Sequence, residues 1–229
     1  MKILGLQKLT LLDFPQRTAA TIFLGGCNFR CPFCHNGDLV TGNFPEEKSE
    51  DEIIKFLEKR KGILDGVCIT GGEPLLNNDI PLLLKKIKAM GFLVKTDTNG
   101  TRPDFLKKLV ESELIDYVAM DIKNSKQRYC ETVGLEELDL CKVEESVDFL
   151  KENRIDYEFR TTVVAEYHDD ESFEEIGKWI GGAKRYFLQR FEDSEYVLKK
   201  GLHSPEEQEL TRYRDIAKKY IEQVEIRGV

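Results

Sequence analysis

Three of the six cysteines in this chain lie within eight residues, at Cys27, Cys31 and Cys34. The spacing C-x-x-x-C-x-x-C places three thiols on one short loop. Three thiolates can bind three irons of a cubane [4Fe–4S] cluster and leave the fourth iron without a protein ligand. An iron with an open site can bind a reactant, whereas a cluster held by four cysteines mainly transfers electrons. The spacing therefore predicts a cluster that takes part in chemistry.

Two other uses of these thiols are less consistent with the sequence. His35 would complete a Cys3His zinc site, but it directly follows Cys34, and adjacent side chains seldom converge on one tetrahedral ion. A disulfide framework is disfavoured because the chain begins without a signal peptide, which indicates a reducing compartment. The remaining cysteines, Cys68, Cys130 and Cys141, are interpreted as buried, inert thiols.

Length and composition limit the class of protein. The 229 residues fit one domain spanning 1–229, with 41% hydrophobic and 33% charged residues. No apolar run approaches the roughly 20 residues that a membrane span needs, so we expect a cytoplasmic protein without a membrane partner. The net charge of −8 argues against nucleic-acid binding, which relies on clustered cations.

Short apolar runs alternate with longer amphipathic stretches along the chain. The predicted strands are 18–24, 66–70, 92–96, 117–122, 157–164, 185–189 and 224–227. The predicted helices are 49–61, 80–90, 103–113, 143–153, 170–177 and 205–223. Ser49 with Glu52, and Ser204 with Glu207, have the spacing of capping boxes. Repeated β-α units predict a parallel sheet covered by helices, either a doubly wound sheet or a barrel.

Polar motifs follow the predicted strands at the point where each one ends. Both candidate architectures gather functional groups at the carboxyl ends of their strands. The cysteine loop follows the first of these strands. Later strands end in or carry Thr70-Gly71-Gly72-Glu73-Pro74, Asp97-Thr98-Asn99-Gly100, Asp121-Ile122-Lys123, Arg160 and Gln189-Arg190. A single Gly-Gly or Asn-Gly pair is often only a turn. Polar groups at six successive strands, the first of which is followed by the cysteine loop, instead indicate one site.

The cysteine loop resembles the cluster motif of the radical S-adenosylmethionine (SAM) superfamily. Its continuation into His35-Asn36, and the stretches Leu12–Pro15 and Thr21–Leu24, are similar to activating enzymes of glycyl-radical enzymes. The resemblance implies a partial (β/α)6 barrel, open on one side. It also implies a [4Fe–4S] cluster held by the three cysteines, with SAM bound to the open iron through its amino and carboxylate groups.

The same resemblance implies roles for the strand-end residues. Gly71, Gly72 and Glu73 are similar to the motif that binds the SAM amino group, and glycines allow close approach of backbone carbonyls. Lys123 would balance the SAM carboxylate, with an internal salt bridge to Asp121 as the alternative, because alternate strand residues share a face. The remaining candidates are Arg160 for the carboxylate, Asp97, Asn99 and Asp121 for the ribose or a bound cation, Phe33 for the adenine, and Gln189 at the sixth strand end.

The function implied is glycyl-radical formation on a partner enzyme, with flavodoxin or ferredoxin as electron donor. Some pyruvate formate-lyase activators carry a histidine at the sixth strand end, where this chain has Gln189. The resemblance is therefore closer to the branch that activates anaerobic ribonucleoside-triphosphate reductase. Three alternatives stay open: a pyruvate formate-lyase-type activase, a small-molecule radical SAM enzyme similar to 7-carboxy-7-deazaguanine synthase, and a non-catalytic iron–sulfur electron carrier.

Overall fold

A single eight-stranded sheet organises the protein. The computed structural model describes residues 1–42 and 47–228, and its strands follow one another in the sheet in chain order. The strands are β1 (Ile3–Thr10), β2 (Ala19–Leu24), β3 (Gly66–Gly71), β4 (Leu93–Thr98), β5 (Tyr117–Asp121), β6 (Asp156–Val163), β7 (Arg185–Arg190) and β8 (Gln223–Arg227). β1 is antiparallel to β2, and every later pair is parallel. Among the described strands, β1 and β8 are the two edges, so the sheet is open.

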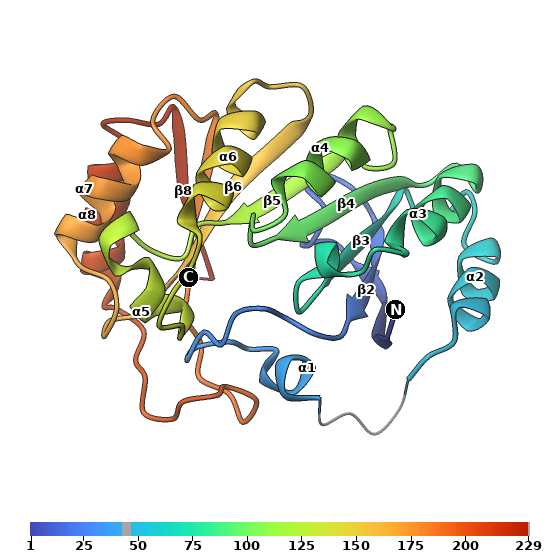
Figure 1. The fold of residues 1–229 in the computed structure, drawn as a ribbon, viewed down its shortest axis with the longest axis horizontal. Helices are drawn as coiled ribbons and strands as arrows, with labels where there is room; N and C mark the ends of the chain where they lie inside the picture. Colours follow the sequence, from blue (N-terminus) through green and yellow to red (C-terminus); the bar gives the residue numbers. More distant parts are fainter. Residues whose placement is uncertain (43–46, 229) are drawn as a thin grey trace.

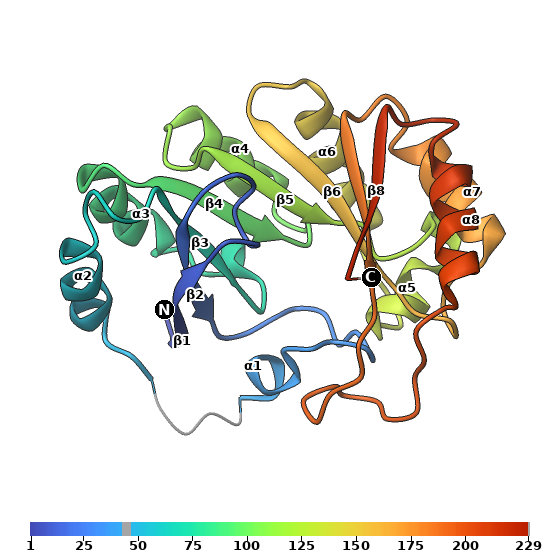
Figure 2. The same cartoon turned by 180° about the vertical axis from the view of Figure 1, so that it is seen from behind.

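The helices are α1 (Gly37–Thr41), α2 (Glu50–Glu58), α3 (Ile80–Ala89), α4 (Pro103–Glu111), α5 (Tyr129–Val133), α6 (Leu140–Lys151), α7 (Asp170–Trp179) and α8 (Glu207–Ala217), with 3-10 turns η1 (Pro74–Leu76) and η2 (Lys126–Arg128). Apart from the short helices α1 and α5, they lie along the outside of the curved sheet (Figures 1 and 2). The segment after β2, which carries the cysteines, and α1 cross below the curved sheet in Figure 1. In a doubly wound sheet helices cover both faces, whereas here the longer helices cover one face of an open sheet. The expected open partial barrel is therefore confirmed.

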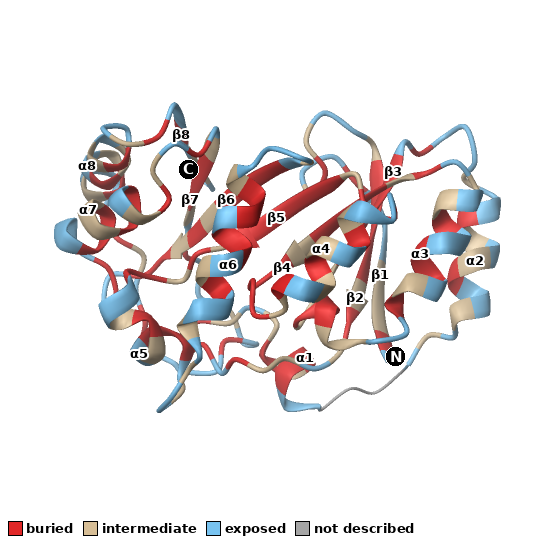
Figure 3. Cartoon of the chain, turned by 45° about the horizontal axis from the view of Figure 1, so that its top comes forward, coloured by how far each residue is buried: buried red, intermediate tan, exposed pale blue. Residues whose placement is uncertain are grey.

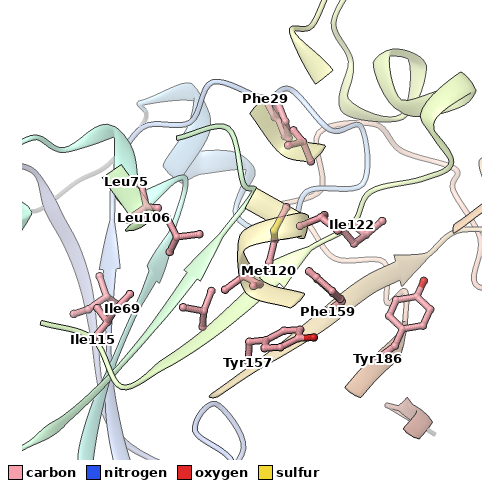
Figure 4. Close-up of a cluster of buried hydrophobic side chains, with 14 of the residues drawn as sticks. Phe29, Ile69, Leu75, Leu106, Ile115, Met120, Ile122, Tyr157, Phe159 and Tyr186 are labelled. Atoms are coloured by element: carbon pink, nitrogen blue, oxygen red, sulfur yellow. The ribbon is translucent and has the colours of Figure 1, made fainter. Parts of the chain in front are cut away.

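The apolar runs form strands because the neighbouring strands and the helices outside the sheet shield their side chains from water. Ile69, Met120 and Phe159 are fully buried between sheet and helices, and Figure 4 shows them in one cluster. Burying each such side chain contributes about 1.5–3 kcal/mol. In Figure 3 the strands are mainly buried, while the helices expose their outward faces. This core fixes the strands whose carboxyl ends carry the polar motifs.

Several sequence predictions need correction. β1 was not predicted, because as an edge strand it is only partly buried and lacks an apolar run. The capping box at Ser49 and Glu52 is confirmed, but the one at Ser204 is wrong. The last helix begins at Glu207 with Glu206 as its N-cap, since Ser204 instead accepts a hydrogen bond from Arg190. That helix also ends at Ala217, before the chain turns into β8.

Toward the carboxyl ends of the strands the inner face of the sheet is polar, in contrast to its outer face. Along β6, Tyr157 and Phe159 pack outward in the core, whereas Arg160 and Thr162 face the barrel interior. Strand periodicity of two produces this separation. The barrel interior is therefore available for chemistry. No helix in the described ranges 1–42 and 47–228 is long and apolar enough to span a membrane.

Candidate active site

One cavity of about 220 Å³ lies at the carboxyl ends of the strands, against the cysteine loop. Every residue that the sequence predicted for the site lines it. These are Cys27, Cys31, Phe33, Cys34, Gly71, Gly72, Glu73, Asp97, Asn99, Asp121, Lys123, Arg160 and Gln189. They come from the loop after β2 and from five consecutive strands, so the fold brings together groups that are far apart in sequence.

The three thiols lie in a water-poor environment. Cys31 is 6% exposed, and Cys27 and Cys34 are half-buried. Burial raises the pKa of Cys27 to about 11 and that of Cys31 to about 12, and it also raises the pKa of Cys34. Lys123 is the strongest opposing influence on Cys31 and Cys34. The metal-free thiols are therefore protonated at neutral pH, and metal binding must displace their protons.

The arrangement of the thiols bears on which metal they suit. Within residues 1–42 and 47–228, no group of three or more His, Cys, Asp or Glu is arranged to hold a metal ion. A Cys3His zinc site brings all its ligands to one ion, whereas a cubane binds each thiolate at a different iron. All six cysteines are free, and Cys68 is buried as expected. Cys141 is exposed on α6 and Cys130 is only partly buried on α5, so the expectation of a buried thiol is wrong at both positions.

Gly71 and Gly72 allow the end of β3 to lie directly against β2 and the cysteine loop. A Cβ at Gly71 would lie 2.2 Å from the Leu24 carbonyl oxygen, and one at Gly72 would lie 2.0 Å from the Gly26 carbonyl oxygen. Gly71 also has φ of +122°, which other residues rarely adopt. The Asn36 side chain donates to the Gly71 carbonyl at 3.0 Å. These glycines are thus required by backbone packing beside Cys27, a reason that the sequence did not show.

Glu73 and Asn99 connect neighbouring strand ends. Glu73 is 1% exposed, and its carboxylate accepts hydrogen bonds from Leu75 N–H, from the Thr98 hydroxyl and from Asn99 N–H. Burial raises the pKa of Glu73 to about 7, against the opposing effect of these hydrogen bonds. The Asn99 side chain donates to Asn28 of the cysteine loop at 2.8 Å. Both residues therefore hold the loops around the cavity in addition to lining it.

A charged network crosses the cavity wall from β4 through the end of β5 to β6. Arg160 pairs with Asp97 at 3.2 Å and with Asp121 at 2.9 Å, and Lys123 pairs with Asp121 at 3.0 Å. Lys95, 1% exposed, pairs with Asp97. Burial by itself would raise the pKa of Asp97, but Arg160 and Lys95 lower it to about 2. Asp121 behaves similarly: Arg160 and Lys123 outweigh burial and lower its pKa.

The charges on the cavity wall are close to balance. Lys123 and Arg160 are the cations that line the cavity, beside the carboxyl groups of Glu73, Asp97 and Asp121; Lys95 pairs with Asp97 but does not line the cavity. The sequence alternative of a Lys123–Asp121 salt bridge is present, and both residues still line the cavity. The two cations lie where they can attract an anionic group such as a thiolate-bound cluster or a carboxylate.

Seven further residues that line the cavity were missed at the sequence level. They are Phe29, His35, Asn36, Val40, Thr70, Thr98 and Thr162. Thr162 could have been found, because it lies two residues after Arg160 on the same face of β6. Phe33 lines the cavity as expected, but it is 3% exposed and also packs on Tyr167 with ring centroids 5.9 Å apart.

Comparison with known proteins agrees with this geometry. A sequence model of the radical SAM superfamily matches residues 21–180. A protein of Methanocaldococcus jannaschii that is provisionally named a glycyl-radical enzyme activating enzyme is 38% identical, over 98% of this chain and 95% of that protein. The chain is a radical SAM enzyme of the glycyl-radical activating family.

One further relative and one solved structure extend this comparison. The pyruvate formate-lyase-activating enzyme of Listeria monocytogenes is 38% identical over 44% of this radical SAM enzyme and 45% of its own length. SuiB of Streptococcus suis, solved with its precursor peptide SuiA, superposes with a TM-score of 0.72 at 16% identity. The match covers 95% of this chain and 50% of SuiB, so the radical SAM enzyme spans half the length of SuiB and shares its fold.

Radical SAM enzymes use a [4Fe–4S] cluster and SAM, and the cavity suits both groups. Among the described residues no fourth cysteine lines the cavity, so the three thiols fit a cluster that keeps one iron open. Lys123 and Arg160 on the same wall can pair with the negative charge that three thiolates and a SAM carboxylate would bring.

Proposed function

We propose that this enzyme forms a glycyl radical on an anaerobic ribonucleoside-triphosphate reductase, with flavodoxin or ferredoxin as the electron donor. The observation that carries the proposal is the cavity in which the three thiols face Lys123 and Arg160. The extensive similarity to a glycyl-radical enzyme activating enzyme supports the choice of reaction. Gln189 on the cavity wall supports the choice of partner, because some pyruvate formate-lyase activators have histidine at the corresponding strand end.

The residues of the cavity divide into two groups by what they would hold. Cys27, Cys31 and Cys34 would bind the cluster. When bound and reduced, it would supply one electron to SAM, which would cleave to methionine and a 5′-deoxyadenosyl radical, and that radical would take a hydrogen atom from the glycine Cα of the partner. Lys123 and Arg160 would pair with the SAM carboxylate.

The remaining contacts to SAM are assigned from the family resemblance, and all of these residues line the cavity. Gly71, Gly72 and Glu73, which lie beside Cys27, would hold the SAM amino group. Asp97, Asn99 and Asp121 would face the ribose or a bound cation, Phe33 would face the adenine, and Gln189 at the sixth strand end is a further candidate contact. The same proposal places the protein in the cytoplasm, where its reductant and partner would be available.

The test is activation of a partner under anaerobic conditions. The reconstituted enzyme is reduced with flavodoxin and incubated with SAM and recombinant anaerobic ribonucleoside-triphosphate reductase. We expect a glycyl doublet in electron paramagnetic resonance on the reductase and 5′-deoxyadenosine formed in step with it. A doublet on pyruvate formate-lyase alone would reassign the partner. Formation of 5′-deoxyadenosine that depends on a small heterocycle, with no protein radical, would refute the proposal.

A further inference from the structure

A second cavity adjoins the active-site cavity on the side of the sheet edge β1. It has a volume of about 230 Å³ and lies between β1, β2, α1 and the segment after β7, with walls that include Gly5, Phe23, Leu39 and Tyr196. His35 and Asn36 line both cavities, so these two residues separate them. The proposed function uses the first cavity for the cluster and SAM and leaves this second one, the apolar pocket, without a role.

The register of the sheet places the floor of the apolar pocket beside the active site. Thr70 on β3 lines the active-site cavity and is paired with Phe23 on β2, and Phe23 is paired with Gly5 on β1. Residues directly opposite each other on neighbouring strands share a face of the sheet. Phe23 and Gly5 therefore lie on the inner face, in line with Thr70, and lead from the active site to the edge strand.

The apolar pocket exposes hydrophobic surface inside the barrel. Leu4 and Phe23 line it and are only partly buried, and neither packs against the two apolar cores formed by the described residues. A Cβ at Gly5 would lie 3.2 Å from Cδ2 of Phe23, so the glycine leaves that part of the ring uncovered by β1. Tyr196 is 52% exposed. Because water against these side chains is unfavourable, the pocket favours an apolar ligand.

The opposite wall of the apolar pocket is held in place by close contacts. A Cβ at Gly37, the first residue of α1, would lie 2.1 Å from the Tyr196 carbonyl oxygen, so the segment after β7 packs directly on this helix. The Asn36 side chain binds the Gly71 carbonyl oxygen and so joins the start of α1 to β3. Figure 2 shows α1 below β1 and β2. Apolar cavities of about 150 Å³ can bind benzene, so this pocket has room for one aromatic or branched side chain.

We infer that the apolar pocket binds one large apolar side chain of the partner polypeptide, within about two residues of the target glycine. This inference rests on the proposed function and names a site that recognises its substrate. The glycine Cα must reach SAM in the first cavity, and the pocket begins on the other side of His35 and Asn36. Two extended residues span about 7 Å, so a neighbouring side chain can occupy the pocket while the glycine lies in the active site.

The chemistry of the substrate supports a side chain as the ligand. A glycine has no side chain of its own, so an enzyme that selects one glycine must bind the residues beside it. The apolar pocket is polar where it meets the active site, at His35 and Asn36, and apolar farther out, at Leu4 and Phe23. This order suits a polypeptide whose main chain passes His35 while one side chain points toward β1.

The test compares two variants of the apolar pocket with a surface control. Phe23→Leu shortens its floor, and Tyr196→Ala removes part of its wall at an exposed position. Leu82→Ala truncates a side chain on α3 that is 62% exposed and lines neither cavity. Reconstituted holoenzymes are titrated with anaerobic ribonucleoside-triphosphate reductase, and the glycyl signal is measured against reductase concentration. SAM affinity without the reductase is measured in parallel.

We expect Phe23→Leu and Tyr196→Ala to raise the half-saturating reductase concentration about five- to tenfold, with SAM affinity unchanged, and Leu82→Ala to match the wild type. The inference is overturned if the wild type forms the glycyl radical and neither pocket variant requires more reductase than it does. A matching loss of SAM affinity in both pocket variants would also overturn it, because the pocket would then belong to the nucleoside. Failure of the wild type to form the radical would instead refute the proposed function.

A second measurement identifies the side chain that is bound. Alanine replaces, one at a time, the two residues on either side of the glycine in the reductase, and each variant is titrated against the wild-type enzyme and Phe23→Leu. We expect one apolar position at which alanine weakens activation by the wild type but has little further effect with Phe23→Leu, since residues in contact are not additive. Additive effects at all four positions would contradict the inference.

Discussion

The carboxylate of Glu73, at the end of β3, accepts a hydrogen bond of 2.6 Å from the backbone N–H of Asn99, at the end of β4. The Asn99 side chain in turn binds Asn28 in the cysteine loop. Three segments that surround the cavity are therefore tied together through one buried carboxylate. Because a buried N–H without an acceptor is costly, the tie also fixes the position of the loop that carries Cys27.

Loss of the Glu73 carboxylate should loosen this arrangement. Glu73→Ala leaves the N–H groups of Leu75 and Asn99 without their acceptor, and we expect the free energy of unfolding to fall by at least about 2 kcal/mol. Urea unfolding of the metal-free protein measures this change, and hydrogen exchange at Asn99 should become faster. Glu58→Ala, at an exposed position on α2, is the control and should leave both unchanged. Equal stability of the two variants would contradict the role of Glu73.

Removal of one cluster thiol should abolish metal retention. In Cys31→Ala only two cavity thiols remain, and we expect bound iron and sulfide after anaerobic reconstitution to fall at least about tenfold. Cys141→Ala, which removes an exposed thiol on α6, should load normally. Iron content and the visible absorbance of the cluster are the measurements. Full loading of Cys31→Ala would mean that the cluster ligands are misassigned.

Lys123→Ala should separate SAM binding from cluster binding. The variant removes the cation that pairs with Asp121 and faces the thiols, so SAM affinity should fall about ten- to a hundredfold while iron content stays normal. Isothermal titration of the reconstituted enzyme with SAM measures the affinity. Lys126→Ala, three residues later and paired with Glu144 at the surface, is the matched control. SAM affinity equal to that of the control would remove Lys123 from the site.

His168 should make stability depend on pH. It is 3% exposed, and one ring nitrogen bonds the Lys123 carbonyl oxygen at 2.9 Å while the other accepts from Val164 N–H at 3.1 Å. Burial lowers its pKa to about 4 from the usual 6.5, so between these values the unfolded chain binds more protons. The contribution of His168 to the free energy of unfolding is fully present above pH 6.5. It falls by about 3 kcal/mol as the pH decreases toward 4.

The comparison with His168→Gln isolates this effect. Urea unfolding of both metal-free proteins is measured from pH 7 to pH 4.5, and groups that titrate in both cancel in the difference. We expect the wild type to lose more stability than the variant over this range. Parallel pH profiles would show that His168 is not held neutral in the fold.

The sequence predicted most of the residues that line the cavity, but not the packing contacts that explain why some of them are required. The cysteine spacing and the strand-end motifs identified residues that the structure places on one cavity, because the carboxyl ends of parallel strands meet at one edge. It did not show that Gly72 is required by the Gly26 backbone, since that contact joins segments far apart in the chain. It also did not predict the ion pair between Arg227 and Glu158, because these residues lie two strands apart in the sheet. Such pairings depend on strand order, which periodicity does not report.

The gap between β1 and β8 has a topological consequence. If the eight strands closed into a complete barrel, side chains would fill its interior. A partner polypeptide could then enter only with a free terminus, through one end of the barrel. Because β1 and β8 do not pair, an internal loop of a large folded protein can enter the barrel from the side and leave by the same route, without either protein unfolding.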